Sequence, residues 1–289
     1  MPVIEPAIRP PAEAGSFLLQ VTTGCSAHGC TFCGAYAGKP FRSKPAGEVD
    51  ADIAEERRAR PGTRRVFLMD GDALALSNAR LVPVLDRLLE AFPLLTRVSS
   101  YACGDQLAQR SGEELSALRD RELSLVYLGL ESGSRDILER RRKRATVEEM
   151  VEGVRRADAA GIRSSVIVLL GLGGKERSAE HVRETVRALN RMQPRHLSFL
   201  SLMLIPGTPL WEEARRGRFV ELDSAGLLRE ARDILAGLDL RRTVFRSDHA
   251  SNHLFLEGRL PADRDKLVRA LDLARAGGLP TRPDSSRGL

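Results

Sequence analysis

Strand patterns and helix patterns alternate along most of this chain, from residue 17 to residue 207. Short runs of apolar and β-branched residues predict strands, and apolar residues at helical spacing predict the helices between them. Such alternation is typical of parallel βαβ units. The predicted strands are FLLQVTT (17–23), RRVFLMD (64–70), RVSSYAC (97–103), ELSLVYLGLE (122–131), IRSSVIVLLGL (162–172) and HLSFLSLMLIPG (196–207).

The expected helices are 47–60, 79–92, 111–120, 146–161, 178–192, 222–238 and 263–278. Ser111 with Glu114, and Thr146 with Glu149, have the spacing of a capping box, which marks a helix start. His181 lies in the middle of a predicted helix, and we expect it to be exposed. Residues 241–260 have no regular pattern. Six such units suit either an open doubly wound sheet or a barrel-like closure.

The composition is that of a globular protein, with 42% hydrophobic and 29% charged residues. The net charge is +6, but most basic residues are arginine, which we attribute to genome composition rather than to nucleic-acid binding. With only 4% aromatic residues, a base-stacking surface is not expected. The sequence has no apolar run long enough to span a membrane and no secretory signal at its start, so we expect a cytoplasmic protein.

Three of the four cysteines, Cys25, Cys30 and Cys33, lie in the segment CSAHGCTFC that directly follows the first predicted strand. Loops at the carboxyl ends of parallel strands carry the active site in βα proteins. Clustered thiols in such a chain favour metal or iron–sulfur ligation over a disulfide framework. His28 lies between the cysteines, so a structural Cys₃His zinc site is one alternative. A four-iron cluster with one open iron is the other.

The segment VTTGCSAHGCTFC resembles the cluster loop of the radical S-adenosylmethionine superfamily, and it is most similar to the relatives of oxygen-independent coproporphyrinogen dehydrogenase. The usual spacing there is C-x3-C-x2-C, whereas this chain has C-x4-C-x2-C. The resemblance implies a partial (β/α)6 TIM-like barrel, a [4Fe–4S] cluster on the three cysteines, and S-adenosylmethionine as the second cofactor. Phe32 matches the aromatic residue before the last cysteine.

Four further segments match in the family's order: FLMDGDA, YLGLESGS, VIVLLGLGG and LMLIPGTPL. The resemblance implies that Gly71 and Asp72 hold the methionine amino group. It implies that Glu131 binds the ribose hydroxyls, with Ser132 and Gly133 allowing close approach of the backbone. The adenosine pocket would be lined by Gly171, Leu204, Ile205 and Pro206.

Each match also has a purely structural interpretation. Glu131 can be an ion-paired residue at a strand end, and Asp72 can be a helix N-cap. The PGTP segment that begins at Pro206 can be an ordinary turn. The basic run 139–144 can be a solvated face, or it can dock an acidic electron donor.

The resemblance covers residues 17–215, after an N-terminal arm (1–16). We expect 216–278 to be a helical and irregular C-terminal extension that closes the barrel, with 245–258 covering the substrate, and 279–289 to be a flexible tail. Cys103, at a strand end, and His249, in the irregular segment, are the candidate catalytic residues. With only Cys103 left after the cluster loop, no thiolate set remains for a second cluster.

These observations predict an oxygen-sensitive radical S-adenosylmethionine enzyme. Reductive cleavage of the cofactor would give a 5′-deoxyadenosyl radical that abstracts hydrogen from a small-molecule substrate. A flavodoxin- or ferredoxin-type protein would donate the electron. The alternative is a zinc- or iron–sulfur-bearing binding protein on a βα scaffold, without radical chemistry.

Overall fold

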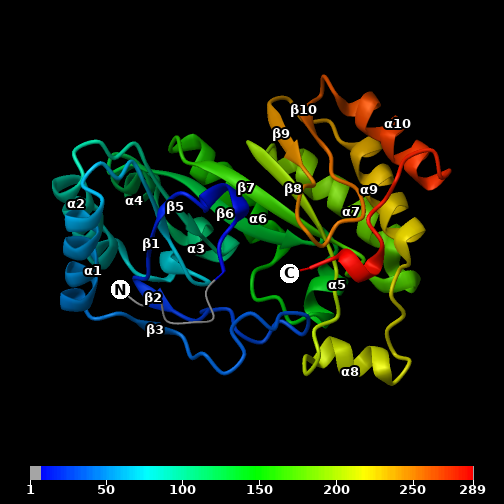
Figure 1. Cartoon of the computed structure of the whole chain (residues 1–289), viewed down its shortest axis with the longest axis horizontal. Coiled ribbons are helices and arrows are strands. Elements are labelled where there is room, and N and C mark those ends of the chain that lie inside the picture. Colours follow the sequence, from blue (N-terminus) through cyan, green and yellow to red (C-terminus); the bar gives the residue numbers. More distant parts are fainter. Residues whose placement is uncertain (1–7, 289) are drawn as a thin grey trace. The chain divides into compact units, whose positions relative to one another are not determined.

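The structure is a computed structural model that describes residues 8–288, and its chain forms two compact units (Figure 1). The first unit comprises the chain up to residue 29, residues 35–128 and residues 152–164. The second comprises residues 30–34, residues 129–151 and the chain from residue 165.

The main sheet has eight strands in the order β1-β4-β5-β6-β7-β8-β9-β10. Strands β1, β4, β5 and β6 pair in parallel in the first unit, as do β7, β8 and β9 in the second, whereas β10 is antiparallel to β9. The mainly parallel α/β fold is therefore confirmed. The strands are β1 (Phe17–Leu19), β4 (Arg65–Leu68), β5 (Arg97–Tyr101), β6 (Leu123–Glu131), β7 (Arg163–Leu170), β8 (His196–Ser201), β9 (Thr243–Arg246) and β10 (Glu257–Leu260).

Most of the helices coincide with the predicted amphipathic segments. Hydrogen bonds between Ser111 and Glu114, and between Thr146 and Glu149, form both predicted capping boxes. The helices are α1 (Ala46–Ala59), α2 (Asn78–Ala91), α3 (Gly104–Gln109), α4 (Gly112–Arg119), α5 (Arg135–Arg140), α6 (Val147–Ala159), α7 (Gly174–Met192), α8 (Pro209–Arg215), α9 (Ser224–Gly237) and α10 (Arg264–Arg275). Short 3₁₀ helices are η1 (Pro11–Glu13), η2 (Ala73–Ala75) and η3 (Asp284–Ser286).

In the first unit, both faces of the parallel strands are covered. Val66 and Leu68 are buried on one face of β4, and α1 and α2 lie side by side outside the strands (Figure 1). On the other face, Phe67 packs with Tyr101 and Tyr127. Burial on both faces is typical of parallel sheets.

The described part of the N-terminal arm supplies a buried carboxylate to this unit. Glu13 is fully buried; it accepts hydrogen bonds from Arg97 Nη2 at 3.0 Å and from the Tyr127 hydroxyl at 2.6 Å. Burial, with Glu13 as a further cause, raises the pKa of Tyr127 well above its usual value of 10.0. The charge and hydrogen bonds of Glu13 are thus satisfied inside the unit. Residues 1–7 of the arm lie outside the described residues.

The second unit has an apolar cluster in which Phe32, from the cysteine segment, packs against Ile137, Leu172 and Leu210. Helices α7, α9 and α10 belong to this unit, and α9 packs against both of the others. These contacts tie the short segment 30–34 to the strands and helices that follow residue 165.

Three segments differ from the sequence-based expectations. The predicted strand 17–23 is broken into β1 and a separate strand β2 (Thr22–Thr23). The segment 241–260, expected to be irregular, contains β9 and β10, because Thr243–Arg246 pairs with Glu257–Leu260. In the expected flexible tail, Arg287 instead donates hydrogen bonds to the carbonyl oxygens of Ser251 and Leu202.

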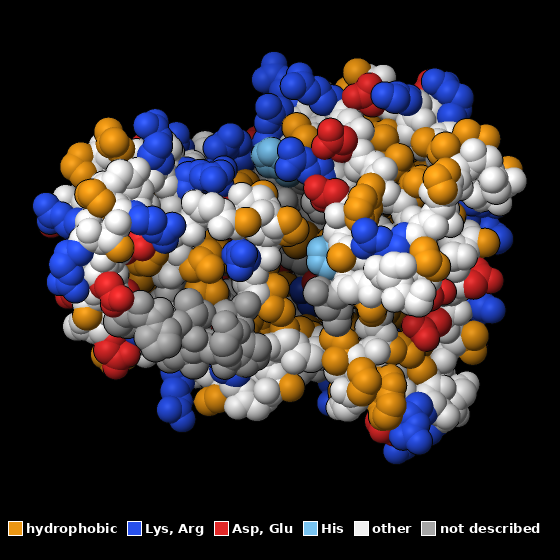
Figure 2. All heavy atoms as spheres, viewed as in Figure 1, with side chains coloured by type: hydrophobic (Ala, Val, Ile, Leu, Met, Phe, Trp, Pro, Cys, Tyr) orange, Lys and Arg blue, Asp and Glu red, His pale blue; other side chains and the backbone are white. Residues whose placement is uncertain are grey.

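Charged side chains are mixed over the surface. On the face in Figure 2, Lys and Arg side chains are spread over the molecule and are interspersed with Asp and Glu. Many of the arginines pair with acids on their own helices, for example Arg135 with Glu139 and Arg156 with Glu152. Within residues 8–288, no helix has the length and apolar character that a membrane span requires.

Candidate functional site

The cysteine loop leaves the first unit through a short two-stranded ribbon. Strand β2 pairs antiparallel with β3 (Arg42–Ser43), and residues 24–41 form the loop between them. Gly24 has a positive φ of 73°, and a Cβ there would lie 2.6 Å from the Lys39 carbonyl oxygen. Glycine is therefore required where the two ends of the loop meet.

Asp70, two residues after the end of β4, anchors the base of this loop. Its buried carboxylate accepts hydrogen bonds from the Gly24 amide at 2.8 Å and from Gln20 Nε2 at 3.1 Å. Lys39 Nζ lies 2.7 Å from the same carboxylate. Asp70 has a left-handed φ of 68°, a costly conformation for a residue with a side chain, which is retained where its surroundings impose it.

The next two residues lie against the first cysteine. The Gly71 amide donates to the Gly24 carbonyl at 2.9 Å, and a Cβ on Gly71 would lie 2.4 Å from Cys25 Cβ. The Asp72 carboxylate is fully buried and accepts a hydrogen bond from the Ser26 hydroxyl. Asp72 precedes η2 but makes no side-chain capping bond, so the N-cap interpretation is not supported.

The middle of the loop, Cys30–Gly34, belongs to the second unit and is held by backbone hydrogen bonds to other segments of that unit. The Thr31 amide donates to the Arg141 carbonyl at 2.9 Å, and the Thr31 carbonyl accepts from the Leu210 amide at 2.9 Å. The Cys33 amide bonds to the Cys30 carbonyl at 3.2 Å, which makes a tight turn. Both hydrogen bonds are made by the Thr31 backbone, which any residue type except proline could supply. The identity of residue 31 therefore could not reveal this anchoring role from the sequence.

The predicted adenine-contacting residues lie beside this segment. Phe32 and Leu204 pack against the same apolar cluster, and a Cβ on Gly34 would lie 2.8 Å from Ile205 Cγ2. Pro206 is exposed. Thr208 accepts a hydrogen bond from the Trp211 amide and so caps α8, which means that the PGTP segment is also a turn and a helix start.

Glu131 ends β6 in a left-handed conformation, with a φ of 61°. Its Oε1 accepts a hydrogen bond from Lys143 Nζ at 3.1 Å. A Cβ on Gly129 would lie 2.1 Å from that same oxygen, so glycine makes room for the carboxylate. The ion pair fixes Glu131 in its place, and both side chains keep 14% exposure.

Ser132 and Gly171 are both buried in the second unit. The Ser132 hydroxyl lies 2.9 Å from His181 Nδ1, and the Gly171 amide donates to Glu230 Oε2 at 2.6 Å. His181 is fully buried, so the expectation of an exposed histidine is wrong. His181 lies on helix α7, which begins at Gly174, and it shares the buried face of that helix with Thr185 and Met192.

The two candidate catalytic residues lie in different settings. Cys103 is the N-cap residue of α3, two residues after the end of β5, and is half-buried. His249 lies between β9 and β10, where its Nδ1 is 2.9 Å from the Ser251 hydroxyl. Burial lowers the pKa of His249, and Asp248 opposes this effect. A catalytic role for either residue stays a prediction.

The basic run 139–144 is not a uniform solvated face. Arg141 is buried; its guanidinium lies 2.9 Å from Glu213 and stacks 5.2 Å from the Phe219 ring centroid. Lys143 pairs with Glu131. Arg140, Arg142 and Arg144 are exposed.

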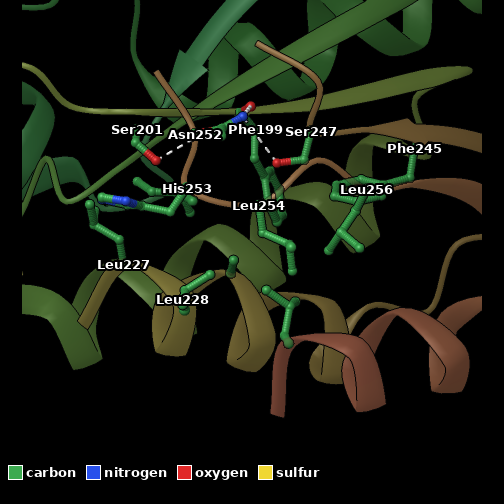
Figure 3. Close-up of a pocket in the computed structure, with 13 residues that line it drawn as sticks. Phe199, Ser201, Leu227, Leu228, Phe245, Ser247, Asn252, His253, Leu254 and Leu256 are labelled. Carbon is green, nitrogen blue, oxygen red and sulfur yellow. Dashed lines mark hydrogen bonds between the residues drawn. The ribbon is translucent and has the colours of Figure 1, made fainter. Parts of the chain in front are cut away.

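A small cavity of the second unit lies between its strands and helices α9 and α10 (Figure 3). Leu227, Leu228 and Leu254 form part of its apolar lining, and Asn252 lies on its strand side, where it bonds to Ser201 and Ser247. Because it is an apolar space against helices, we interpret this cavity as part of the core.

The three loop thiols are divided between the two units, with Cys25 in the first and Cys30 and Cys33 in the second. Within residues 8–288, no three Cys, His, Asp or Glu side chains are grouped closely enough to hold one metal ion, so the role of these thiols as an iron–sulfur ligand set stays a prediction. Cys25 and Cys30 are half-buried and Cys33 is exposed, so none is withdrawn into the core. His28 is exposed, and its amide donates to the Cys25 carbonyl at 3.2 Å. Thiolates are the usual ligands of such clusters, and three leave one iron of a four-iron cluster for another ligand.

The mainly parallel sheet and a cysteine loop at its strand ends define an α/β protein of the partial-barrel class. Residues 19–189 match the family model described as the Radical SAM superfamily, which is more than half of the chain. The chain therefore belongs to this superfamily. No curated protein matches the sequence.

Solved structures show the same fold at low sequence identity. Coproporphyrinogen III oxidase (HemN) from Escherichia coli has a TM-score of 0.54 and 14% identity, covering 76% of this chain and 50% of its own. The methyltransferase TsrM from Kitasatospora setae, with a TM-score of 0.54 and 22% identity, covers 70% of this chain and 39% of its own. Methylornithine synthase (PylB) has a TM-score of 0.54 and 17% identity, with coverages of 92% and 83%. This chain thus spans half the length of HemN and less than half the length of TsrM.

Proposed function

We propose that this enzyme binds one [4Fe–4S] cluster through Cys25, Cys30 and Cys33 and uses S-adenosylmethionine to abstract hydrogen from a small-molecule substrate. The observation that carries the proposal is the anchored cysteine loop. Asp70 fixes its base, and the main chain of Thr31 fixes its middle, while the thiols are not fully buried. Anchoring at these two places reduces the cost of ordering the ligands when the cluster binds.

When bound, the cluster and S-adenosylmethionine supply the reductive cleavage that generates a 5′-deoxyadenosyl radical. The protein supplies orientation and exclusion of water. Gly71 lets the chain pass close to Cys25, and Asp72 would accept a hydrogen bond from the cofactor's amino group. Glu131, held by Lys143, would accept hydrogen bonds from the ribose hydroxyls. These are charge-assisted bonds, the stronger kind.

The remaining assignments concern the adenosine, the substrate and the electron donor. Leu204 and Ile205 would contact the adenine. Residues 245–258, with His249, would cover the substrate, and Cys103 would face it. The exposed side chains Arg140, Arg142 and Arg144 suit an acidic flavodoxin- or ferredoxin-type electron donor, because opposite charge speeds association.

Anaerobic reconstitution tests the proposal. With iron, sulfide and a reductant, we expect a brown protein that converts S-adenosylmethionine to 5′-deoxyadenosine and methionine, measured by chromatography. The matched control is the protein with all three loop cysteines replaced by alanine, which should stay colourless and inactive. A wild-type protein that takes up zinc, binds no iron and leaves the cofactor intact would overturn the proposal.

A further inference from the structure

Two ionisable side chains are buried next to each other in the second unit, on helices α7 and α9. His181 and Glu230 are 0% and 1% exposed, and His181 Nε2 lies 3.8 Å from Glu230 Oε2. Burial lowers the pKa of His181 to about 4 and raises that of Glu230 to about 7. Burial thus favours the uncharged form of both side chains. Burying polar groups costs free energy unless their bonds repay it.

Each member of the pair holds the main chain just beyond the end of a strand. His181 Nδ1 lies 2.9 Å from the hydroxyl of Ser132, which directly follows β6, and that hydroxyl accepts a bond from the Ser134 amide at 3.1 Å. Glu230 Oε2 accepts from the amide of Gly171, which directly follows β7, at 2.6 Å.

A third anchor lies one turn along α7. Thr185 Oγ1 accepts a hydrogen bond from the Gly133 amide at 3.0 Å. Gly133 is so close to α7 that a Cβ would lie 2.1 Å from the Glu184 carbonyl oxygen. Because Ser132 and Gly133 are held in this way, the position of Glu131, the preceding residue, is fixed relative to α7.

The segment after β7 is fixed from α9 in a similar way. Gly171 has a positive φ of 83°, and a Cβ there would lie 2.9 Å from Leu227 Cδ2. Its amide would be an unsatisfied buried donor without the Glu230 carboxyl, and unsatisfied donors are rare in folded proteins.

We propose that His181 and Glu230 are positioning residues for S-adenosylmethionine, acting through Ser132 and Gly171 on the two strand-end segments that hold the nucleoside. The inference rests on the proposed function, in which Glu131 and Gly171 contact the cofactor. Neither His181 nor Glu230 touches the cofactor itself. Their contribution is preorganisation, which reduces the ordering cost of binding.

The test compares variants that keep or remove each hydrogen bond. Glu230→Gln retains an acceptor for the Gly171 amide, whereas Glu230→Met does not. His181→Asn retains a polar atom near the position of Nδ1, whereas His181→Leu does not. The dissociation constant for S-adenosylmethionine is measured by equilibrium binding to the reconstituted enzyme, together with the iron content.

For the Met and Leu variants, we expect the iron content to be retained and the dissociation constant to rise about tenfold, which corresponds to about 1.4 kcal/mol. The Gln and Asn variants should stay near the wild-type value. If Glu230→Met or His181→Leu does not fold, the Ser132→Ala variant provides a milder test, because it removes only the hydroxyl that contacts His181. We expect this variant to bind S-adenosylmethionine more weakly than the wild type.

Two failures are distinguishable. Folded, iron-loaded Met and Leu variants that bind S-adenosylmethionine as the wild type does would overturn the positioning role, even if their unfolding midpoints fall, and would leave the proposed function intact. If the Met and Leu variants do not fold, a Ser132→Ala protein that binds S-adenosylmethionine as the wild type does would also overturn the positioning role. A wild-type enzyme that loads no cluster or does not bind the cofactor would overturn the proposed function instead.

Discussion

The amide of Gly71 donates a hydrogen bond to the carbonyl oxygen of Gly24, 2.9 Å away, so that the segment after β4 lies directly against the start of the cysteine loop. The contact leaves no room for a side chain at residue 71, because a Cβ would lie 2.8 Å from Cys25 Sγ. The position of the first cysteine therefore depends on a glycine nearly fifty residues away in the sequence.

Gly71→Ala should displace Cys25 and reduce the iron content after reconstitution several-fold, measured by iron analysis and by the visible absorbance of the cluster. Gly62→Ala is the matched control, because no atom lies within 4 Å of a Cβ at residue 62. Equal iron loading in the Gly71→Ala and Gly62→Ala proteins would contradict the close-contact explanation.

Replacing Cys25, Cys30 or Cys33 by alanine should abolish cluster binding and cofactor cleavage, since two thiolates do not hold a four-iron cluster in this loop. His28→Ala should load iron normally, because we assign no ligand role to His28. Electron paramagnetic resonance of the reduced proteins checks both statements. Loss of the metal from His28→Ala would instead support the Cys₃His zinc alternative.

Glu131→Gln should keep the cluster and weaken S-adenosylmethionine binding at least tenfold. Each charge-assisted hydrogen bond contributes roughly 1.5–3 kcal/mol, and the amide retains only part of it. Glu139→Gln removes the acid of an exposed ion pair with Arg135 and serves as the control. A titration in which both variants match the wild type would remove Glu131 from the cofactor site.

The buried pair predicts opposite pH dependences of stability in two variants. The lowered pKa of His181 means that the unfolded state takes up the proton first, so its contribution is lost as pH falls from 6.5 toward about 4. The raised pKa of Glu230 means that the unfolded state loses the proton first, so its contribution is lost as pH rises from 4.5 toward about 7. In the wild type the two effects oppose each other.

Glu230→Gln leaves only the histidine effect, and this variant should lose stability between pH 6.5 and 4.5 relative to the wild type. His181→Asn leaves only the glutamate effect and should lose stability between pH 4.5 and 7. Each effect is at most on the order of 3 kcal/mol. Urea unfolding at several pH values measures both slopes, and slopes of the same sign would contradict the assignment.

His249→Ala should retain the cluster and slow cleavage of S-adenosylmethionine without substrate, yet lose turnover of the true substrate. The reason is its place between β9 and β10 in the segment that we propose covers the substrate. Product analysis with candidate metabolites under anaerobic reducing conditions provides the measurement. Normal turnover, or a protein that does not fold, would show that this role is wrong.

The sequence predicted the elements that depend on local signals. The capping boxes at Ser111 and Thr146 form as their spacing indicates. Strands β4 to β8 lie within the predicted segments because apolar runs in parallel sheets are continuous. The cysteine spacing and the strand-end motifs indicated the superfamily, because a metal loop needs its ligands close together in sequence.

The elements that were missed depend on distant partners. β9 and β10 are four residues each, and their pairing across ten residues has no turn signal. Asp70 anchors the cysteine loop through contacts with Gly24 and Lys39, which precede it by more than thirty residues, so no local pattern indicates this role. His181 and Glu230 are polar residues on buried helix faces, so a hydrophobic pattern assigns them to the surface.

The turn from Cys25 to His28 explains how the longer first interval of the cysteine motif is accommodated. His28 and Gly29 are exposed, Gly29 has a φ of 116°, and nothing lies within 4 Å of a Cβ there. The second interval has no such freedom, because an insertion between Cys30 and Cys33 would pull Thr31 off both of its backbone partners. We therefore expect one added residue to disturb the structure less in the first interval than in the second.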